Sequence, residues 1–386
     1  MTSPEMIARL VGFDTTSRES NLTLMAFIQD YLAGHGVDSH LVPSEDGRKA
    51  NLYATIGPED RGGVLLSGHT DVVPVDGQDW HTAPFAVSEQ NGRLHGRGTT
   101  DMKSFIAVAL ALVPEMTAAP LATPIHFALS YDEEVGCLGV RRLIAMLNGA
   151  PQALRPRLCL VGEPTGMAVV IAHKGKRGYD VQVRGLEAHS SLAPQGVNAI
   201  EYAAELIAFM KGLARRLEAE GPFDADFDIP HTTLHTGVIA GGTVLNIVPG
   251  DCRFAFEIRS LPSDDHTRLL DAIQGFIETD LHPRMKAIDP ACGITITEGA
   301  AFPALDTRAD ADVVAFAKAL TGRNDHAKVA FGTEAGLFQE TAGIPTVVCG
   351  PGHIAQAHKP NEFIALDQVA QCETMLRRLI ERCSAA

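Results

Sequence analysis

The feature that most constrains this chain is the alternation of short apolar segments with helical segments in its first and last parts. The apolar runs of strand length lie at residues 51–56, 64–66, 125–129, 158–161, 328–331 and 346–349. Segments with helical periodicity lie within the first 36 residues and at residues 101–116, 140–147, 309–320 and 367–382. Strands separated by helices predict βαβ units. We therefore expect an α/β domain with a mainly parallel sheet and helices on both faces.

The middle of the chain has a different pattern. Apolar and polar residues alternate at residues 179–183, 233–239 and 253–258, as they do in strands with one exposed face. Helical segments lie at about 198–217 and 269–277, and residues 294–297 can form a last strand. This βαββαβ order predicts an inserted α+β ferredoxin-like domain with an antiparallel sheet.

The length of the chain also favours two domains. It has 386 residues, which exceeds the roughly 250–300 residues at which a single hydrophobic core stops growing. We expect a first domain formed by residues 1–176 and 300–386, and an inserted domain formed by residues 177–299.

Charge and cysteine content exclude several classes of function. The formal net charge of −15 disfavours nucleic acid and anionic membranes as partners. The seven cysteines are odd in number and contain no CxxC motif, which favours a reducing compartment over a disulfide framework. The N-terminus has no signal-peptide pattern, and the longest apolar stretch, residues 105–113, is too short to span a bilayer. We expect a cytoplasmic protein.

Five short segments each carry an Asp, Glu or His in a position suited to a metal. They are residues 67–71 (SGHTD), 96–103 (GRGTTDMK), 132–136 (DEEVG), 162–164 (GEP) and 356–360 (QAHKP). Four of them follow predicted strands, and the other precedes a helix on the same sheet. Ligands of open α/β sheets bind outside the carboxyl ends of the strands. Two imidazoles and several carboxylates together suit a hydrolytic zinc pair.

The first two segments each have a simpler interpretation. His69 would bind metal through one ring nitrogen while Asp71 accepts a hydrogen bond from the other, but the pair can also be a loop histidine beside a turn aspartate. Asp101 opens the helix predicted for residues 101–116, and its spacing alone favours an N-cap. A bridging carboxylate would have a different use, because it lowers the repulsion between two dications.

The other three segments also have simpler interpretations beside the metal site. Glu133 and Glu134 follow Asp132, and such a triplet can be a solvated acidic loop. In a metalloenzyme, one carboxylate binds metal and another transfers protons. Glu163 can be a simple charge at a strand end, and His358 can be an ordinary loop histidine. Convergence of all five segments at one edge of one sheet favours the metal site.

In this order and with these neighbours, the segments resemble the zinc aminoacylase/carboxypeptidase family of metallohydrolases. The most specific pieces are residues 67–74 (SGHTDVVP), 98–103 (GTTDMK) and 132–136 (DEEVG). The resemblance covers the whole chain and is closest to the acetylornithine deacetylase branch. The pieces that carry this closer resemblance include residues 188–194 (AHSSLAP), 241–249 (GGTVLNIVP), 257–262 (EIRSLP), 331–335 (FGTEA) and 350–358 (GPGHIAQAH). The family often has Ser at position 353, where this chain has His353, a third imidazole to which we assign no role.

The resemblance implies a role for each residue of the five segments. One zinc would be held by His69 and Glu163, the other by Glu134 and His358, and Asp101 would bridge the two ions. Cobalt is an alternative metal. The remaining two acids would have catalytic roles: Glu133 as general base and acid, and Asp71 as the residue that orients His69.

The resemblance also assigns roles to the inserted domain, which in relatives pairs with its copy in a homodimer and closes over the site as a lid. His189 would reach the partner's site and support the oxyanion, and Arg259 would bind the α-carboxylate of the substrate. Asn246 and Thr333 would add hydrogen bonds, and Glu334 would hold a substrate ammonium group.

Together these implications predict a zinc-dependent amide hydrolase that removes an acyl group, most simply acetyl, from an N-acyl amino acid. The resemblance favours N-acetyl-L-ornithine, whose hydrolysis to L-ornithine and acetate belongs to arginine biosynthesis. Desuccinylation of succinyl-diaminopimelate, carbamoyl removal, or dipeptidase and carboxypeptidase activity are alternatives in the same family. A catalytically degenerate protein that binds an amino-acid derivative is the alternative outside enzymes.

Overall fold

The computed structural model describes residues 1–384, which form two compact units. The first consists of Met1–His173, Leu305–Lys328 and the chain from Thr333 onward, and the second of Lys174–Ala304 and Val329–Gly332. Within the described residues, none of the helices combines the length and the apolar character needed to cross a membrane.

The first unit is built on a large sheet whose strands run in the order β1-β2-β6-β3-β7-β15-β8-β13, with β14 paired to β8. The strands are β1 (Ser39–Pro43), β2 (Ala50–Ile56), β3 (Val64–His69), β6 (Ile125–Ser130), β7 (Leu158–Pro164), β8 (Val170–His173), β13 (Leu305–Asp306), β14 (Ala327–Val329) and β15 (Thr346–Gly350). The central strands β6, β3, β7 and β15 are parallel, and the pairs toward the edges are antiparallel. A small separate sheet contains β4 (Ser88–Gln90), β5 (Arg93–His95) and β16 (Phe363–Ala365).

Helices cover both faces of the large sheet, as the sequence predicted. They are α1 (Ser3–Val11), α2 (Leu22–Ala33), α3 (Lys103–Ala111), α4 (Val113–Ala118), α5 (Val140–Gly149), α9 (Asp312–Thr321), α10 (Ala335–Glu340) and α11 (Leu366–Ser384), with short 3₁₀ turns at Gln152–Leu154 and Ile354–Gln356. Helix α3 packs on β3 and β7 and contacts α1 and α11, whereas α5 contacts β2 and β6, and α10 contacts β7 and β15.

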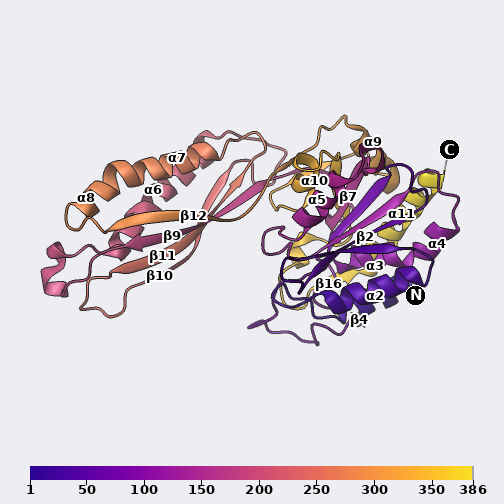
Figure 1. Ribbon diagram of the computed structural model, residues 1–386, viewed down its shortest axis with the longest axis horizontal. Helices are drawn as coiled ribbons and strands as arrows, with labels where there is room; N and C mark the ends of the chain where they lie inside the picture. Colours follow the sequence, from indigo (N-terminus) through magenta and orange to yellow (C-terminus); the bar gives the residue numbers. More distant parts are fainter. Residues whose placement is uncertain (385–386) are drawn as a thin grey trace. The chain divides into compact units, whose positions relative to one another are not determined.

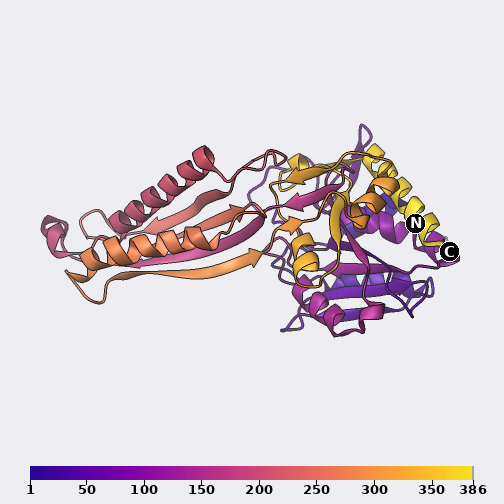
Figure 2. The same ribbon diagram turned by 90° about the horizontal axis from the view of Figure 1, so that it is seen from above.

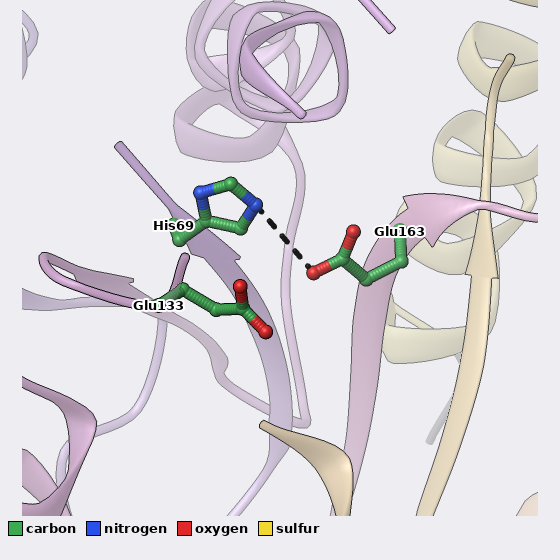
Figure 3. Close-up of side chains that lie close together, drawn as sticks. All are labelled: His69, Glu133 and Glu163. Carbon is green, nitrogen blue, oxygen red and sulfur yellow. Dashed lines mark ion pairs between the residues drawn. The ribbon is translucent and has the colours of Figure 1, made fainter. Parts of the chain in front are cut away.

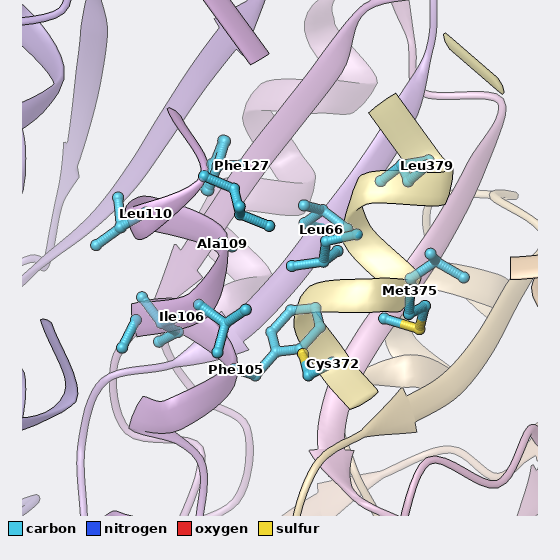
Figure 4. Close-up of a cluster of buried hydrophobic side chains, with 14 of the residues drawn as sticks. Leu66, Phe105, Ile106, Ala109, Leu110, Phe127, Cys372, Met375 and Leu379 are labelled. Atoms are coloured by element: carbon cyan, nitrogen blue, oxygen red, sulfur yellow. The ribbon is translucent and has the colours of Figure 1, made fainter. Parts of the chain in front are cut away.

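The main core fills the space between the sheet and α3 and α11. Leu66 of β3 and Phe127 of β6 meet Phe105 of α3 and Met375 of α11, and all four are at most 2% exposed (Figure 4). Burying a side chain of this size contributes about 1.5–3 kcal/mol. The core therefore fixes the strands whose ends carry the polar segments.

The second unit has the predicted βαββαβ order, and its sheet runs β10-β11-β9-β12 with antiparallel neighbours. Its elements are β9 (Gly175–Arg184), a 3₁₀ turn (Ser190–Gln195), α6 (Ala199–Glu220), β10 (Thr233–Gly241), β11 (Asp251–Ser260), α7 (Thr267–Phe276), a π-helical turn (Ile277–Leu281), α8 (His282–Lys286) and β12 (Gly293–Phe302). The helices lie on one face of the sheet (Figure 1), and α6 and α7 run along the strands (Figure 2).

The alternation in β9 explains this arrangement. Tyr179, Val181 and Val183 are buried against the helices, whereas Asp180 and Gln182 between them are exposed. Because successive side chains of a strand point to opposite faces, the sheet has one covered and one open face.

Two predicted helices differ from the structure at their ends. The helical segment within the first 36 residues is two helices, α1 and α2, because α1 ends at Val11 with Gly12 as its C-cap. The helix predicted for residues 101–116 begins at Lys103 and breaks at Leu112, and a new helix starts there with Pro114 in its first turn. Proline is tolerated in a first turn because its missing N–H would have no intrahelical partner there.

Candidate metal centre

The polar segments of the first unit converge because they follow neighbouring parallel strands. His69 is the last residue of β3, which pairs with β6 on one side and β7 on the other. Glu133 lies in the loop after β6, and Glu163 lies at the end of β7. Figure 3 shows the carboxylates of both acids directed toward the space beside the His69 ring. The strand order alone therefore brings these side chains together.

The approach of Glu163 depends on the glycine before it. A Cβ on Gly162 would lie 2.0 Å from the ring of Phe105, so a larger residue would displace helix α3 or the strand. Glycine thus lets β7 pack directly on the helix that follows the Asp101 loop.

Asp101 lies between two imidazoles. Its Oδ1 is 3.0 Å from Nε2 of His69, and its Oδ2 is 3.2 Å from Nε2 of His358. Each ring nitrogen also faces a second acid: His69 Nε2 is 3.6 Å from Glu163 Oε1, and His358 Nε2 is 3.0 Å from Glu134 Oε2. The site thus consists of two half-sites. One contains His69 and Glu163, the other contains His358 and Glu134, and Asp101 is shared by both.

These distances fit a pair of tetrahedral cations. Two ligand atoms that are each about 2.0 Å from a tetrahedral zinc lie roughly 3.3 Å apart, close to the four separations. A single Nε2 carries at most one hydrogen, so it cannot donate fully to two carboxylates. Glu134 Oε1 is buried and, among residues 1–384, has no hydrogen-bond partner. A cation in each half-site would occupy these unused acceptor positions.

The charges of the site also favour bound cations. Burial raises the pKa of Glu133 to about 8, and burial together with the charge of Asp101 raises the pKa of Glu134 and of Glu163. Hydrogen bonds to Asp101 and Glu134 raise the pKa of His358 to about 10. Protons are held tightly because the buried carboxylates lack compensating charge. Divalent cations would supply that charge and displace the protons.

Asp71 organises the site through both its backbone and its carboxylate. Its backbone oxygen is 2.9 Å from His69 Nδ1, and its carboxylate Oδ1 is 3.5 Å from the same nitrogen. The carboxylate also accepts the backbone N–H groups of Glu133 and Glu134, at 3.1 and 3.3 Å. Asp71 therefore links His69 to the loop that carries the two adjacent acids.

Two of the simpler interpretations from the sequence are wrong. Asp101 is not the N-cap of α3, because Met102 precedes the first helical residue and the Asp101 side chain faces the two histidines. The acidic triplet is not a solvated loop, since Glu133 lies beside His69 and Glu163 and the other two acids are paired. Asp132 forms an ion pair with Lys49, while Glu134 faces His358.

The predicted substrate contacts in the first unit are buried near this site. Thr333 accepts the backbone N–H of Ala335 at 3.0 Å, at the start of α10. Glu334 is 1% exposed and accepts hydrogen bonds from the hydroxyl groups of Ser67 and Ser130. Burial raises the pKa of Glu334 to about 7.

The predicted contacts in the second unit lie on its loops and on β11. His189 is exposed, and its Nδ1 accepts the backbone N–H of Ser191 at 3.2 Å. The backbone N–H of Ser190 donates to the backbone oxygen of Asn246 at 3.0 Å, so the loops that carry His189 and Asn246 are adjacent. Arg259 on β11 donates its Nε–H to Glu257 at 2.7 Å.

Three residues of the site were missed from the sequence. Ser17 donates to the Asp71 carboxylate at 2.7 Å, and Arg97 forms a buried ion pair with Glu362, which accepts the backbone N–H of Asp101 at 3.1 Å. Arg97 stands in the GRGTTDMK segment, a signal that could have been used, whereas nothing in the local sequence marks Ser17 or Glu362. His353 has a structural role: its Nδ1 accepts the backbone N–H of Ala355 and so caps the 3₁₀ turn Ile354–Gln356, which precedes His358.

Comparison with known proteins agrees with this geometry. The family model described as peptidase family M20/M25/M40 matches residues 65–382. The chain belongs to this family. It is 33% identical to an acetylornithine deacetylase of Pasteurella multocida over 98% of this chain and 95% of the relative. It is 35% identical to that of Myxococcus xanthus, over 97% and 95%. An M20 metallo-carboxypeptidase structure from Sulfolobus solfataricus matches with a TM-score of 0.77 at 18% identity, over 99% of each chain.

Membership in the family confirms the predicted class of enzyme. The chain is a metal-dependent hydrolase that acts on amide bonds, and its two-unit fold is the fold of the M20 structures. The alternative of a degenerate binding protein is therefore set aside.

Proposed function

We propose that this hydrolase removes the acetyl group from an N-acetyl amino acid, with N-acetyl-L-ornithine as the preferred substrate and two zinc ions as cofactor. The observation that carries the proposal is the position of Asp101, with one carboxylate oxygen toward His69 and the other toward His358. The similarity to acetylornithine deacetylases over nearly the full length supports the choice of acyl group and amino acid.

In this proposal, His69, Glu163 and Asp101 hold one cation, and His358, Glu134 and Asp101 hold the other. Such a pair supplies Lewis acids that polarise the amide carbonyl and make water more acidic. Cobalt has the same ligand preferences and is the alternative metal.

Glu133 is the proposed proton carrier. Its carboxyl takes a proton from the attacking water and returns it to the amine nitrogen that leaves. The base role needs the carboxylate form of Glu133, which the positive charge of the two cations would favour. Asp71 keeps Glu133 in place through the backbone N–H that it accepts at 3.1 Å.

His189 is the proposed donor to the oxyanion. Since its Nδ1 accepts the Ser191 N–H, the neutral ring carries its proton on Nε2, where it can be donated to a negative oxygen. Arg259 would bind the substrate carboxylate, with Asn246 and Thr333 adding hydrogen bonds. Glu334 as the ammonium site has the least support, because two serine hydroxyls already donate to its carboxylate.

A panel of N-acyl amino acids tests the substrate. We expect kcat/KM for N-acetylornithine to exceed the values for N-acetylmethionine, N-succinyl-diaminopimelate and a dipeptide by about tenfold or more, because a site that pairs a charged substrate group discriminates strongly against analogues lacking it. Preference for the succinyl compound or the dipeptide would instead assign the chain to another activity of the same family.

We also propose that the second unit forms a homodimer through β10. This strand is at the edge of its sheet and exposes 67% of Val238 and 52% of Ile239. An exposed apolar edge strand favours pairing with another copy. Val238→Lys should shift the mass measured by light scattering from dimer to monomer. A native protein that is monomeric would contradict the proposal.

If His189 acts on the partner's site, mixing inactive His189→Ala and Glu133→Gln proteins should restore some turnover. In a mixed dimer, one site would combine an intact Glu133 with an intact His189 from the other chain.

The reaction is proposed to take place in the cytoplasm, as a step of arginine biosynthesis. All seven cysteines lie within the described residues, and each is a buried free thiol. This state is typical of a reducing compartment. The pathway follows only from the proposed substrate and depends on the panel above.

A further inference from the structure

A buried ion pair between Arg97 and Glu362 holds the backbone of the Asp101 loop. Arg97 and Glu362 have side chains only 1% exposed, and Arg97 Nη1 donates to Glu362 Oε2 at 2.6 Å. The other carboxylate oxygen of Glu362 accepts the backbone N–H groups of Thr100 and Asp101, at 2.8 and 3.1 Å. Glu362 therefore fixes the backbone from which the Asp101 carboxylate extends.

The same guanidinium reaches the loop that carries His358. Arg97 Nη2 donates to Gln78 Oε1 at 2.6 Å, and Gln78 Nε2 donates to the backbone oxygen of His358 at 3.1 Å. Arg97 Nη1 also lies 3.3 Å from the backbone oxygen of Lys359. One continuous set of hydrogen bonds thus joins the backbones of Asp101 and His358.

The chain has one tryptophan, and it is part of this network. Trp80 Nε1 donates to Gln78 Oε1 at 3.1 Å, and the Arg97 guanidinium lies 5.1 Å from the Trp80 ring. The next residue, His81, donates its backbone N–H to Asn361 at 2.7 Å. The fluorescence of Trp80 can therefore report on the loop around His358.

The two half-sites need this support to different degrees. His69 is 1% exposed at the end of a central strand, so the core already fixes it. The His358 side chain is 53% exposed and stands on a loop residue with φ of 62°. Besides the contacts of its ring with Asp101 and Glu134, its position depends on contacts of the loop backbone, and Gln78 makes one of these.

We propose that Gln78, held by Arg97, is a positioning residue that sets the half-site of His358 and Glu134 for its cation, whereas Glu362 positions Asp101 for both half-sites. The inference rests on the proposed two-metal function. It goes further by predicting that loss of Gln78 weakens one half-site and not the other. Gln78 donates to the backbone oxygen of His358 and, among residues 1–384, makes no hydrogen bond to His69, Glu163 or Asp101.

The test uses Gln78→Ala, since removing Arg97 or Glu362 alone would leave a buried charge unpaired and endanger the fold. Metal-free native and variant proteins are titrated with zinc against a chromophoric chelator, and Trp80 emission is recorded. We expect two equivalents in the native protein. In the variant, one equivalent should bind about 10–100-fold more weakly, as is typical when an outer partner of a ligand is lost, with the other unchanged.

Gln29→Ala is the matched control, because Gln29 is a half-buried glutamine on α2 whose side chain contacts only Ser39 among the hydrogen bonds of residues 1–384. It should bind both equivalents as the native protein does. The emission change of Trp80 should accompany the weaker equivalent in the variant. Unchanged binding in Gln78→Ala, or equal weakening of both equivalents, would overturn the positioning role. A native protein that binds fewer than two ions would instead refute the two-metal function.

Discussion

Glu133→Gln is expected to lower kcat by about 10²–10⁴-fold, because an amide cannot carry the proton from water to the leaving amine. The variant should retain the fold and bind metal with native stoichiometry, since glutamine has nearly the same shape and Glu133 is not one of the proposed ligands. The measurement is steady-state kinetics on the best substrate of the panel, together with metal analysis and thermal unfolding.

The exposed Glu59 offers a control for the same chemical change. Glu59→Gln should leave kcat unchanged. If Glu133→Gln retained native turnover, or lost turnover only because it lost metal, Glu133 would not be the proton carrier. The proposed exchange of a proton between water and the amine would then need another residue.

Exhaustive chelation should reduce turnover by a factor of about 10³ or more, because Lewis-acid polarisation of the carbonyl lowers the activation barrier by several kcal/mol. Adding back zinc or cobalt should restore it. The Asp101 carboxylate faces both half-sites, so we expect full recovery only with two equivalents per chain. Turnover that survives complete removal of metal would contradict the metal centre.

The metal-free protein should also show an unusual dependence of stability on pH. Burial raises the pKa of Glu133 to about 8, and the pKa values of Glu134 and Glu163 are raised as well, so the folded state binds these protons more tightly than the unfolded state. The contribution of Glu133 is therefore present below about pH 4.5 and is lost as the pH rises through about 8, and the raised pKa values of Glu134 and Glu163 act in the same direction. Hydrogen bonds to the acids raise the pKa of His358 to about 10, and this shift acts in the same direction.

Metal should reverse this trend. Its ligands must lose their protons to bind, so metal binding, and the stability that it adds, increase with pH. Thermal unfolding between pH 5 and 9, with and without zinc, measures both slopes. Equal slopes in the two forms would mean that the cation does not replace the protons of the buried carboxylates.

Much of the site could be predicted because its signals are local. His69 and Glu163 stand at the ends of strands that are recognisable as short apolar runs, and parallel strands of one sheet end at the same edge. The alternation in residues 179–183 likewise predicted which side chains of β9 would be covered.

Other parts of the site could not be predicted because they depend on distant segments. The spacing around Asp101 favoured a helix cap, and only its packing against His69 and His358 gives the carboxylate another use. Ser17 and Glu362 lie far from their partners in the chain, at Asp71 and Asp101. A single sequence contains no signal for contacts of this kind.

The sequence by itself determined the alternation of the main strands and helices, the two-unit organisation of the fold and the residue types available for a metal, because periodicity and turn chemistry act over a few neighbouring residues. Only the tertiary structure decided that Asp101 stands between two histidines, that Glu362 accepts its backbone N–H and that Arg97 pairs with Glu362. The physical reason is that a buried charge needs a partner of opposite charge or a hydrogen bond. Here those partners come from distant segments, and the packed core sets which segments meet.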